Sequence, residues 1–260
     1  MLAQWVAHYW HWKIPVGSTL PDIFPGTGGE VLFNLGAPLQ LSTLSLETGD
    51  LIRGQIVPER GAVVLLPRRA RLALAADGVV DMLSIRLRSA TCFPLLGVAL
   101  DELEISTPLA ELGLPFPISV LLSQTDEMRI SQLEQWLLGI LNRNDRCDSR
   151  LTWAVDKLYY GDNLRVIRNQ LGINERTLQR RIHQFTGVDA RYFCRTARFQ
   201  RTLRHILSGN SILDCAIQHG YADQSHFIKT CRLFTGRPPC TLLTTQYRQL
   251  NHYWPVKPST

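Results

Sequence analysis

Two segments in the C-terminal half of the chain carry side chains whose chemistry suits the edges of DNA bases. In the first, Leu178, Ile182 and Phe185 recur at i, i+4 and i+7, which predicts a helix with one buried apolar stripe. The opposite face of that helix carries basic and amide side chains: Arg176, Gln179, Arg180 and His183. Arginine places two donors on guanine and glutamine pairs with adenine, and each such pair contributes about 1–3 kcal/mol of discrimination.

The second segment follows the same plan. Phe227, Cys231 and Phe234 form its apolar stripe. Its other face carries polar and basic side chains: Gln224, Ser225, His226, Lys229 and Arg232. Ile228 also leans outward, where it suits a thymine methyl group. For a single outward residue such as Lys229, contact with a phosphate is the alternative to contact with a base, and both roles stay open.

The elements around these two helices form an internal repeat. Residues 163–187 and 212–236 each contain a short helix, a glycine turn, a longer helix and then Phe-Thr-Gly, with Gly172 matching Gly220. The predicted helix starts carry capping residues: Asp162 or Asn163, Asn174, Ser211 with Asp214, and Asp223. Two helices joined by a glycine turn predict a helix-turn-helix, whose second helix enters the major groove of DNA.

Residues 190–207, between the two units, predict one long helix. Its apolar side is made of Phe193, Phe199, Leu203, Ile206 and Leu207. Arginines recur every three or four residues on another side: Arg191, Arg195, Arg198, Arg201 and Arg204. Such a helix spans about 27 Å, close to the turn of DNA, about 34 Å, that separates successive major grooves. The arginines then suit phosphates, which position a protein without specifying sequence; a solvated basic face is the alternative.

The doubled unit resembles the C-terminal DNA-binding domain of the AraC/XylS family of bacterial transcription regulators. The resemblance covers residues 164–242 and is strongest in the second copy, which carries most of the family signature: Ile212, Ala216, Gly220-Tyr221, Asp223-Gln224-Ser225, Phe227, Phe234, Gly236 and Pro239. Three positions depart from the family pattern: Asp189-Ala190 in place of Ser-Pro, Thr202 in place of alanine, and Leu242 in place of an aromatic residue. These departures affect packing and the angle between the units.

The resemblance assigns roles by position. It implies base contacts at Asn174, Arg176, Gln179, Arg180, Gln224, Ser225, His226 and Lys229. We expect phosphate contacts at Arg181, Arg191, Arg195, Arg198 and Arg232.

The first ninety residues predict a small β-sandwich or barrel. Short apolar runs at 30–35, 39–46, 50–57, 62–66 and 79–87 are separated by glycine, proline and aspartate turns. Short helical pieces follow around 93–96 and 109–112, and then a longer helix at 125–143. Regulators of the resembled family commonly begin with a cupin-like effector-binding barrel, and residues 30–36, 85–88 and 93–98 are similar to one subgroup of these domains. Because only His8 and His11 precede His183, we expect no metal site.

These observations predict an α+β protein of two domains. Residues 1–146 are expected to form a cupin-like sensory domain with trailing helices, and its last residues, 142–146, are the expected linker. Residues 150–248 are expected to form an all-α domain of two helix-turn-helix units joined by a long helix, and residues 249–260 a tail.

Two apolar features of the sensory domain have alternative interpretations. Leu133, Trp136, Leu137, Ile140 and Leu141 form one face of the long helix. That face either packs on its own domain or makes a homodimer. Trp5, Tyr9, Trp10 and Trp12 belong either to an edge strand packed on the core or to an effector pocket.

Charge separates the two halves and limits the functional classes. Residues 150–260 contain 17 Lys/Arg and 6 Asp/Glu, whereas residues 1–149 contain 11 and 16, so the basic excess lies on the module expected to meet DNA. We expect no membrane span or secretory signal. Six irregularly spaced cysteines indicate reduced core thiols rather than disulfides, with redox sensing as the alternative: Cys92, Cys147, Cys194, Cys215, Cys231 and Cys240.

The sequence therefore predicts a cytoplasmic regulator that binds specific double-stranded DNA and has neither catalytic residues nor a cofactor, since nucleotide-binding, hydrolase and metalloprotease motifs are not found. The expected partners are DNA, RNA polymerase, a small-molecule effector and a second copy of the chain. The alternative function is a non-enzymatic nucleic-acid-binding module without effector control, and an RNA-binding module is disfavoured because the aromatic residues point inward.

Overall fold

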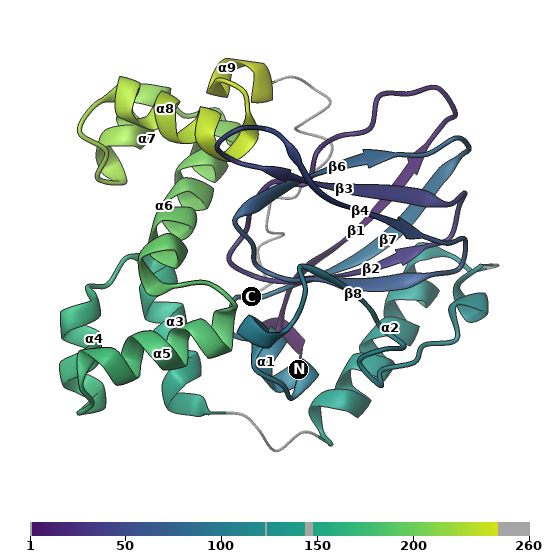
Figure 1. Ribbon diagram of the computed structural model, residues 1–260, viewed down its shortest axis with the longest axis horizontal. Coiled ribbons are helices and arrows are strands. Elements are labelled where there is room, and N and C mark those ends of the chain that lie inside the picture. The colour runs from purple at the N-terminus through teal and green to yellow at the C-terminus, as the bar shows by residue number, and fades with distance from the viewer. Residues whose placement is uncertain (1, 123, 144–147, 244–260) are drawn as a thin grey trace.

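A computed structural model describes residues 2–122, 124–143 and 148–243. The predicted tail at 249–260, the greater part of the predicted linker and Cys147 lie outside these residues. Within them, the chain forms a β-sandwich with flanking helices, followed by a helical domain (Figure 1). The predicted α+β architecture is confirmed, and the two sheets face each other as a sandwich rather than closing into a barrel.

The sandwich contains a five-stranded and a three-stranded antiparallel sheet. The larger sheet has the order β1-β7-β2-β5-β8, with β1 Val6–Ile14, β7 Val80–Leu87, β2 Glu30–Asn34, β5 Ala62–Leu65 and β8 Ser106–Pro108. The smaller sheet has the order β4-β3-β6, with β4 Leu51–Val57, β3 Leu39–Ser45 and β6 Ala70–Ala75. All five predicted strands are present, whereas β6 and β8 were not expected.

The core between the sheets explains the N-terminal aromatic residues. Trp10 and Trp12 are 7% and 5% exposed and pack with apolar residues of both sheets. The indole nitrogen of Trp10 donates a 2.6 Å hydrogen bond to the buried carboxylate of Glu30. Because β1 is the edge of the five-stranded sheet, the edge-strand interpretation of these aromatic residues is confirmed.

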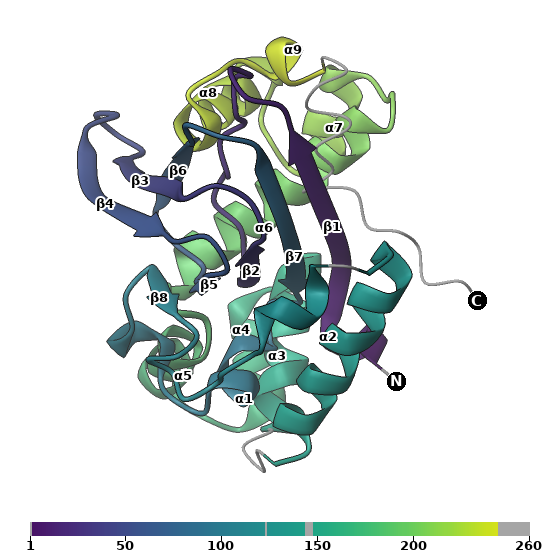
Figure 2. The same cartoon turned by 90° about the vertical axis from the view of Figure 1, so that its right-hand side faces the viewer.

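The helix α2, Asp126–Leu141, covers the outer face of the larger sheet (Figure 2). Thr125 caps its first turn, and Leu133, Leu137 and Ile140 are at most 3% exposed. These side chains pack on Phe33 and its neighbours in their own domain. These three residues therefore pack on their own domain, as the first interpretation of this face predicts, whereas Trp136 and Leu141 are half-buried. A homodimer through this face stays a prediction.

Short helices and turns complete the N-terminal domain. They are η1 Leu2–Gln4, α1 Cys92–Leu96, η2 Leu100–Glu102 and η3 Ile118–Leu121. The piece around 93–96 is helical as predicted, but residues 109–112 form successive turns instead of a helix. Gly113, with φ of +67°, ends that segment after a single turn.

The C-terminal domain follows the predicted repeat. It contains α3 Ser149–Tyr160, α4 Leu164–Leu171, α5 Glu175–Thr186, α6 Ala190–Leu207, α7 Ile212–Gln218, α8 Gln224–Thr235 and α9 Pro239–Leu242. Figure 1 shows α6 running between a lower group, α3 to α5, and an upper group, α7 to α9, with the sandwich beside it. The two helix-turn-helix units are thus held at opposite ends of one helix.

The two domains share one apolar core rather than meeting at a thin contact. Phe24 and Ala90 of the sandwich are buried together with Phe193, Phe199 and their neighbours in the helical domain. Gln200 of α6, 6% exposed, accepts a 2.9 Å hydrogen bond from the Thr27 hydroxyl. Movement of one domain against the other therefore requires apolar surface and buried polar groups to separate.

Candidate DNA-binding surface and interdomain cavity

The first helix-turn-helix consists of α4 and α5. Asn163 caps α4 by accepting a 2.8 Å hydrogen bond from the Arg165 amide, and Gly172 ends it with φ of +64°. Asn174 then caps α5 through a 2.8 Å bond from the Thr177 amide. This local sequence brings α5 off the turn as a separate helix, as the repeat predicts.

The buried stripe of α5 determines which residues it presents. Leu178, Ile182 and Phe185 are at most 1% exposed, as predicted. The side chains predicted to read bases are exposed on the opposite side: Asn174, Arg176, Gln179 and Arg180. The Gln179 amide nitrogen donates a 3.0 Å hydrogen bond to Glu175, which holds the amide along the helix. The structure thus gathers the four predicted base-contact residues of this unit on one solvent-exposed face.

The second unit, α7 and α8, repeats this geometry. Ser211 caps α7 through the Asp214 amide, and Asp223 caps α8 through a 2.7 Å bond from the His226 amide. Phe227, Cys231 and Phe234 are fully buried. The predicted base-contact residues are all exposed: Gln224, Ser225, His226 and Lys229. The imidazole of His226 stands edge-on to Tyr221, with ring centroids 5.2 Å apart, so its orientation is fixed by packing.

The spacer helix α6 holds the two units apart. Its 18 residues bury eleven side chains, among them Phe193, Phe199, Leu203, Ile206 and Leu207. At 1.5 Å per residue it is about 27 Å long. The helices α5 and α8 adjoin its two ends in the chain.

The arginines of α6 do more than present charge. Arg195 lies over the rings of Tyr192 and Phe234, at 5.6 and 5.3 Å from their centroids. Arg198 lies 4.6 Å from the Tyr221 centroid and donates a 3.2 Å bond to the Gly220 carbonyl at the second turn. These two side chains thus fix the second unit on the spacer. The sequence pattern did not predict this structural role.

The remaining predicted phosphate contacts are placed differently. Arg191 and Arg232 are exposed on α6 and α8. Arg181, one residue after Arg180, turns toward the start of α3 and lies 3.8 Å from the Asp148 carboxylate. This places Arg181 at the margin of the reading face.

A segment of the N-terminal domain contacts the start of α6 and the end of α8. The Tyr192 hydroxyl donates a 3.0 Å bond to the Arg68 carbonyl, and Arg69 forms an ion pair with Asp189, the cap of α6. Arg71 donates a 3.0 Å bond to the Thr235 carbonyl at the end of α8. The sequence analysis missed these residues, although three arginines within 67–71 of an otherwise acidic half were a visible signal.

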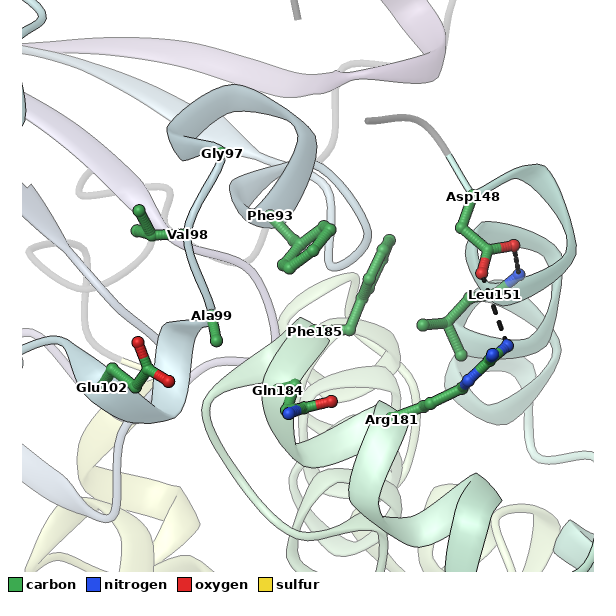
Figure 3. Close-up of a pocket in the computed structure, with 10 residues that line it drawn as sticks. All are labelled: Phe93, Gly97, Val98, Ala99, Glu102, Asp148, Leu151, Arg181, Gln184 and Phe185. Carbon is green, nitrogen blue, oxygen red and sulfur yellow. Dashed lines mark hydrogen bonds and ion pairs between the residues drawn. The ribbon is translucent and has the colours of Figure 1, made fainter. Parts of the chain in front are cut away.

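An apolar cavity of about 500 Å³ lies between the domains (Figure 3). Phe93 of α1 stacks on Phe185 of α5 at its floor, with ring centroids 5.0 Å apart. Val98, Ala99 and Leu151 line it further, and charged or polar groups stand at its edges: Glu102, Asp148, Arg181 and Gln184. Its volume and apolar lining fit a small organic ligand. The reverse side of a reading helix forms one wall, so a ligand here would contact the DNA-binding unit directly.

The described residues contain no cluster of three or more metal-binding side chains, and no described helix is long and apolar enough to cross a membrane. Burial raises the pKa of Cys92 and of Cys231 to about 12, so both thiols stay protonated. Cys215 is buried and Cys194 half-buried, and burial raises the pKa of each. These four cysteines are placed as the predicted core thiols, whereas Cys240 is exposed.

Comparison with known proteins identifies the family of the two helix-turn-helix units. Residues 167–245 match a family described as a helix-turn-helix domain. This match spans both units and α6, so the predicted resemblance of this region is confirmed. No curated protein sequence matches the chain.

Solved structures of ToxT from Vibrio cholerae share the fold over almost the full length. One, in the P21 crystal form, is 13% identical with a TM-score of 0.53, covering 90% of this chain and 97% of that one. A second, wild-type ToxT from strain SCE256 bound to an unsaturated fatty acid, is 13% identical with a TM-score of 0.53, covering 92% and 96%. A third, bound to (E)-4-(8-methylnaphthalen-1-yl)but-3-enoic acid, is 12% identical with a TM-score of 0.55, covering 90% and 98%.

Proposed function

Because residues 167–245 form a double helix-turn-helix domain of the AraC type, we propose that the protein is a bacterial transcription regulator that binds specific double-stranded DNA. In this function α5 and α8 enter two successive major grooves on one face of the duplex. One observation carries the proposal. The two helices at opposite ends of α6 bury equivalent apolar stripes and expose equivalent sets of base-reading side chains.

We assign base contacts to both exposed faces. Arg176 and Arg180 supply bidentate donors for guanine, while Gln179 and Gln224 supply amide pairs for adenine. The other base contacts fall to Asn174, Ser225, His226 and Lys229. Phosphate contacts fall to Arg181, Arg191, Arg195, Arg198 and Arg232, which set the register of the protein on the duplex.

The test separates these two roles. A specific duplex is first selected from genomic fragments with the purified protein, and binding is then compared with a random duplex across a salt series. Arg180→Ala is expected to lower the ratio of specific to random affinity by about 5–150-fold, the equivalent of one bidentate base contact. Arg191→Ala is expected to weaken both duplexes alike and to reduce the salt slope by about one.

Arg191 is the better phosphate variant because Arg195 also packs on two aromatic rings. Lys13→Ala, at an exposed position of β1, is the control and leaves both affinities unchanged. If Arg180→Ala weakens both duplexes equally, Arg180 does not read bases. If no sequence is enriched from the genomic fragments, the regulator function itself is wrong.

We also propose that a small apolar effector occupies the cavity beside α5. Its floor of Phe93 and Phe185 suits an apolar body, and the ToxT structures bound to an unsaturated fatty acid and to a naphthalenyl butenoic acid support a ligand of this kind. Ala99→Trp fills the cavity and is expected to abolish binding of the apolar fluorescent probe 1-anilinonaphthalene-8-sulfonate. Specific DNA binding that responds to no apolar ligand would favour the alternative, a nucleic-acid-binding module without effector control.

Two protein partners belong to the same proposal. RNA polymerase is the partner that a transcription regulator needs, and α7 exposes Leu213 and Ile217, 45% and 57%, beside the second unit. A homodimer is proposed through β4, the free edge of the smaller sheet, which exposes Leu51, Ile52 and Ile56. Ile56→Glu is then expected to halve the sedimentation mass, because it separates the dimer into single chains. Leu213→Glu is expected to leave the sedimentation mass unchanged.

The proposal includes neither catalysis nor a cofactor. The protein is proposed to act on DNA in the cytoplasm.

A further inference from the structure

A second cavity, of about 280 Å³, lies across η2 from the apolar one and has a different chemistry. It is enclosed by the β5–β6 connection, by η2 and by the C-terminal end of α5. Three basic side chains line it, Arg68 and Arg69 from the sensory domain and His183 from the reading helix, against one carboxylate, that of Asp101. The cavity is therefore a basic hollow between the two domains.

The basic groups are held in place by the surrounding structure. Arg68 is only 3% exposed, and its guanidinium donates a 3.0 Å bond to the Leu66 carbonyl. Arg69 lies over the Tyr192 ring, 4.8 Å from the centroid, and pairs with Asp189. The Nδ1 atom of His183 lies 3.1 Å from the Asp101 carboxylate. Contacts within the protein thus orient all three groups toward this region of the domain interface.

From this geometry we propose that the cavity binds the anionic group, carboxylate or phosphate, of a small polar metabolite. Guanidinium groups form short, charge-assisted hydrogen bonds with such oxygens. A buried guanidinium favours an anion in contact with it, because charges in a low-dielectric site attract strongly. The volume lies just below the range of about 300–1,000 Å³ that holds drug-sized ligands, so the ligand is small.

Such an anion bridges the domains. Arg68 and Arg69 hold it from the sensory side, and His183 holds it from α5, three residues beyond the base-reading Arg180. To do so, His183 exchanges the Asp101 carboxylate for the bound anion. This site goes beyond the proposed regulator function and does not depend on the apolar effector.

The test is isothermal titration calorimetry of the full-length protein with inorganic phosphate, at constant ionic strength with chloride as the background anion. One saturable site per chain is expected. Arg69→Gln and His183→Gln are each expected to weaken phosphate binding about tenfold, the loss of one charge-assisted hydrogen bond. Asp101→Asn is expected to tighten it, because this change removes the carboxylate that competes with the bound anion for His183. If these residues had only a structural role, Asp101→Asn would not raise the affinity for phosphate.

The matched control is Arg180→Gln, which removes a charge from the DNA-reading face of the same helix. It is expected to leave phosphate affinity within about twofold of the wild type. A competition titration with succinate then distinguishes the two anionic groups. If succinate displaces phosphate, the site takes carboxylates; if it does not, the site is specific for phosphate. Both results support the proposal.

Three results overturn it: no saturable binding of phosphate or succinate, an equal loss from Arg180→Gln and Arg69→Gln, or weaker binding in Asp101→Asn. Thermal unfolding of each variant identifies any that fails to fold. Binding of the selected duplex is measured on the same samples. If the protein binds the duplex but not the anion, the regulator function holds and only the proposed anion site is wrong.

Discussion

Gly236 lies at the contact between the N-terminal domain and the helix α8. It follows Phe234 and Thr235 at the end of α8, with φ of +71°. A methyl group added there overlaps the Arg71 guanidinium, whose Nη1 donates the 3.0 Å bond to the Thr235 carbonyl. Gly172, at the turn of the first unit, has φ of +64°, and an added methyl group meets nothing within 4 Å. The two glycines therefore differ in their surroundings but not in backbone conformation.

The expected cost of each alanine follows from this difference. A left-handed conformation costs a residue with a side chain about 1–2 kcal/mol, and this applies to Gly172→Ala and Gly236→Ala alike. Gly236→Ala must also displace the end of the Arg71 side chain, which is flexible, so the added cost is limited to the lost hydrogen bond. Hydrogen bonds to charged groups contribute about 1.5–3 kcal/mol. Gly236→Ala is therefore expected to lower the free energy of unfolding by that amount more than Gly172→Ala.

The assay is chemical denaturation of the full-length protein, followed by tryptophan fluorescence, within a double-mutant cycle. In an Arg71→Ala background the hydrogen bond is already absent, so Gly236→Ala is expected to cost no more than Gly172→Ala. An extra cost of Gly236→Ala that survives in this background would refute the reasoning. So would equal costs for the two substitutions in the wild-type protein.

Three further outcomes are expected. Leu137→Ala is expected to lower the free energy of unfolding by about 2–5 kcal/mol, because this 0% exposed side chain packs in its own domain, and to leave the sedimentation mass unchanged. Burial lowers the pKa of His219 from 6.5 to about 4. Between these pH values the unfolded chain binds more protons than the folded chain, so the free energy of unfolding falls as the pH falls. His219→Gln is expected to make the denaturation midpoint depend less on pH over this range, and an unchanged dependence would contradict this explanation. Tyr192→Phe removes the hydrogen bond to the Arg68 carbonyl and is expected to lower the free energy of unfolding by about 0.5–1.5 kcal/mol in the same denaturation assay. An unchanged free energy of unfolding would show that this hydrogen bond does not stabilise the domain interface.

The helical domain could be predicted from local sequence because its signals are local. Capping residues at 163, 174, 211 and 223 mark helix starts, glycines mark turns, and apolar spacing fixes the buried faces of α5 and α8. Each of these features acts within a few residues, so a single sequence reveals it. The positions of the reading residues on exposed faces follow from the same periodicity.

The sandwich was harder to predict because its strands pair across long separations. The strand β6 begins with Ala70-Arg71 directly after two other arginines, so this segment appears polar, yet it pairs with β3. The strand β8 is three residues long and pairs with β5, which is about forty residues earlier. Neither strand carries an apolar run like those that marked β2, β3, β4, β5 and β7.

The domain interface was beyond local reasoning for a further reason. Arginines are expected at the surface, and periodicity alone assigned those of α6 to phosphates. In the structure, Arg195 and Arg198 pack on aromatic rings, and Arg69 and Arg71 join the sensory domain to the reading units. Residues far apart in sequence meet here, and no spacing rule predicts which cation finds which partner.

We propose that one chain reads two successive major grooves through α5 and α8. Protection of guanine N7 from dimethyl sulfate is measured on the selected duplex in complex with the wild-type protein, with Arg180→Ala and with Lys229→Ala. The wild-type protein is expected to protect two major-groove segments about 10–10.5 base pairs apart on one face, of which Arg180→Ala loses one and Lys229→Ala the other. A single protected groove, or two grooves that both variants lose together, would contradict it.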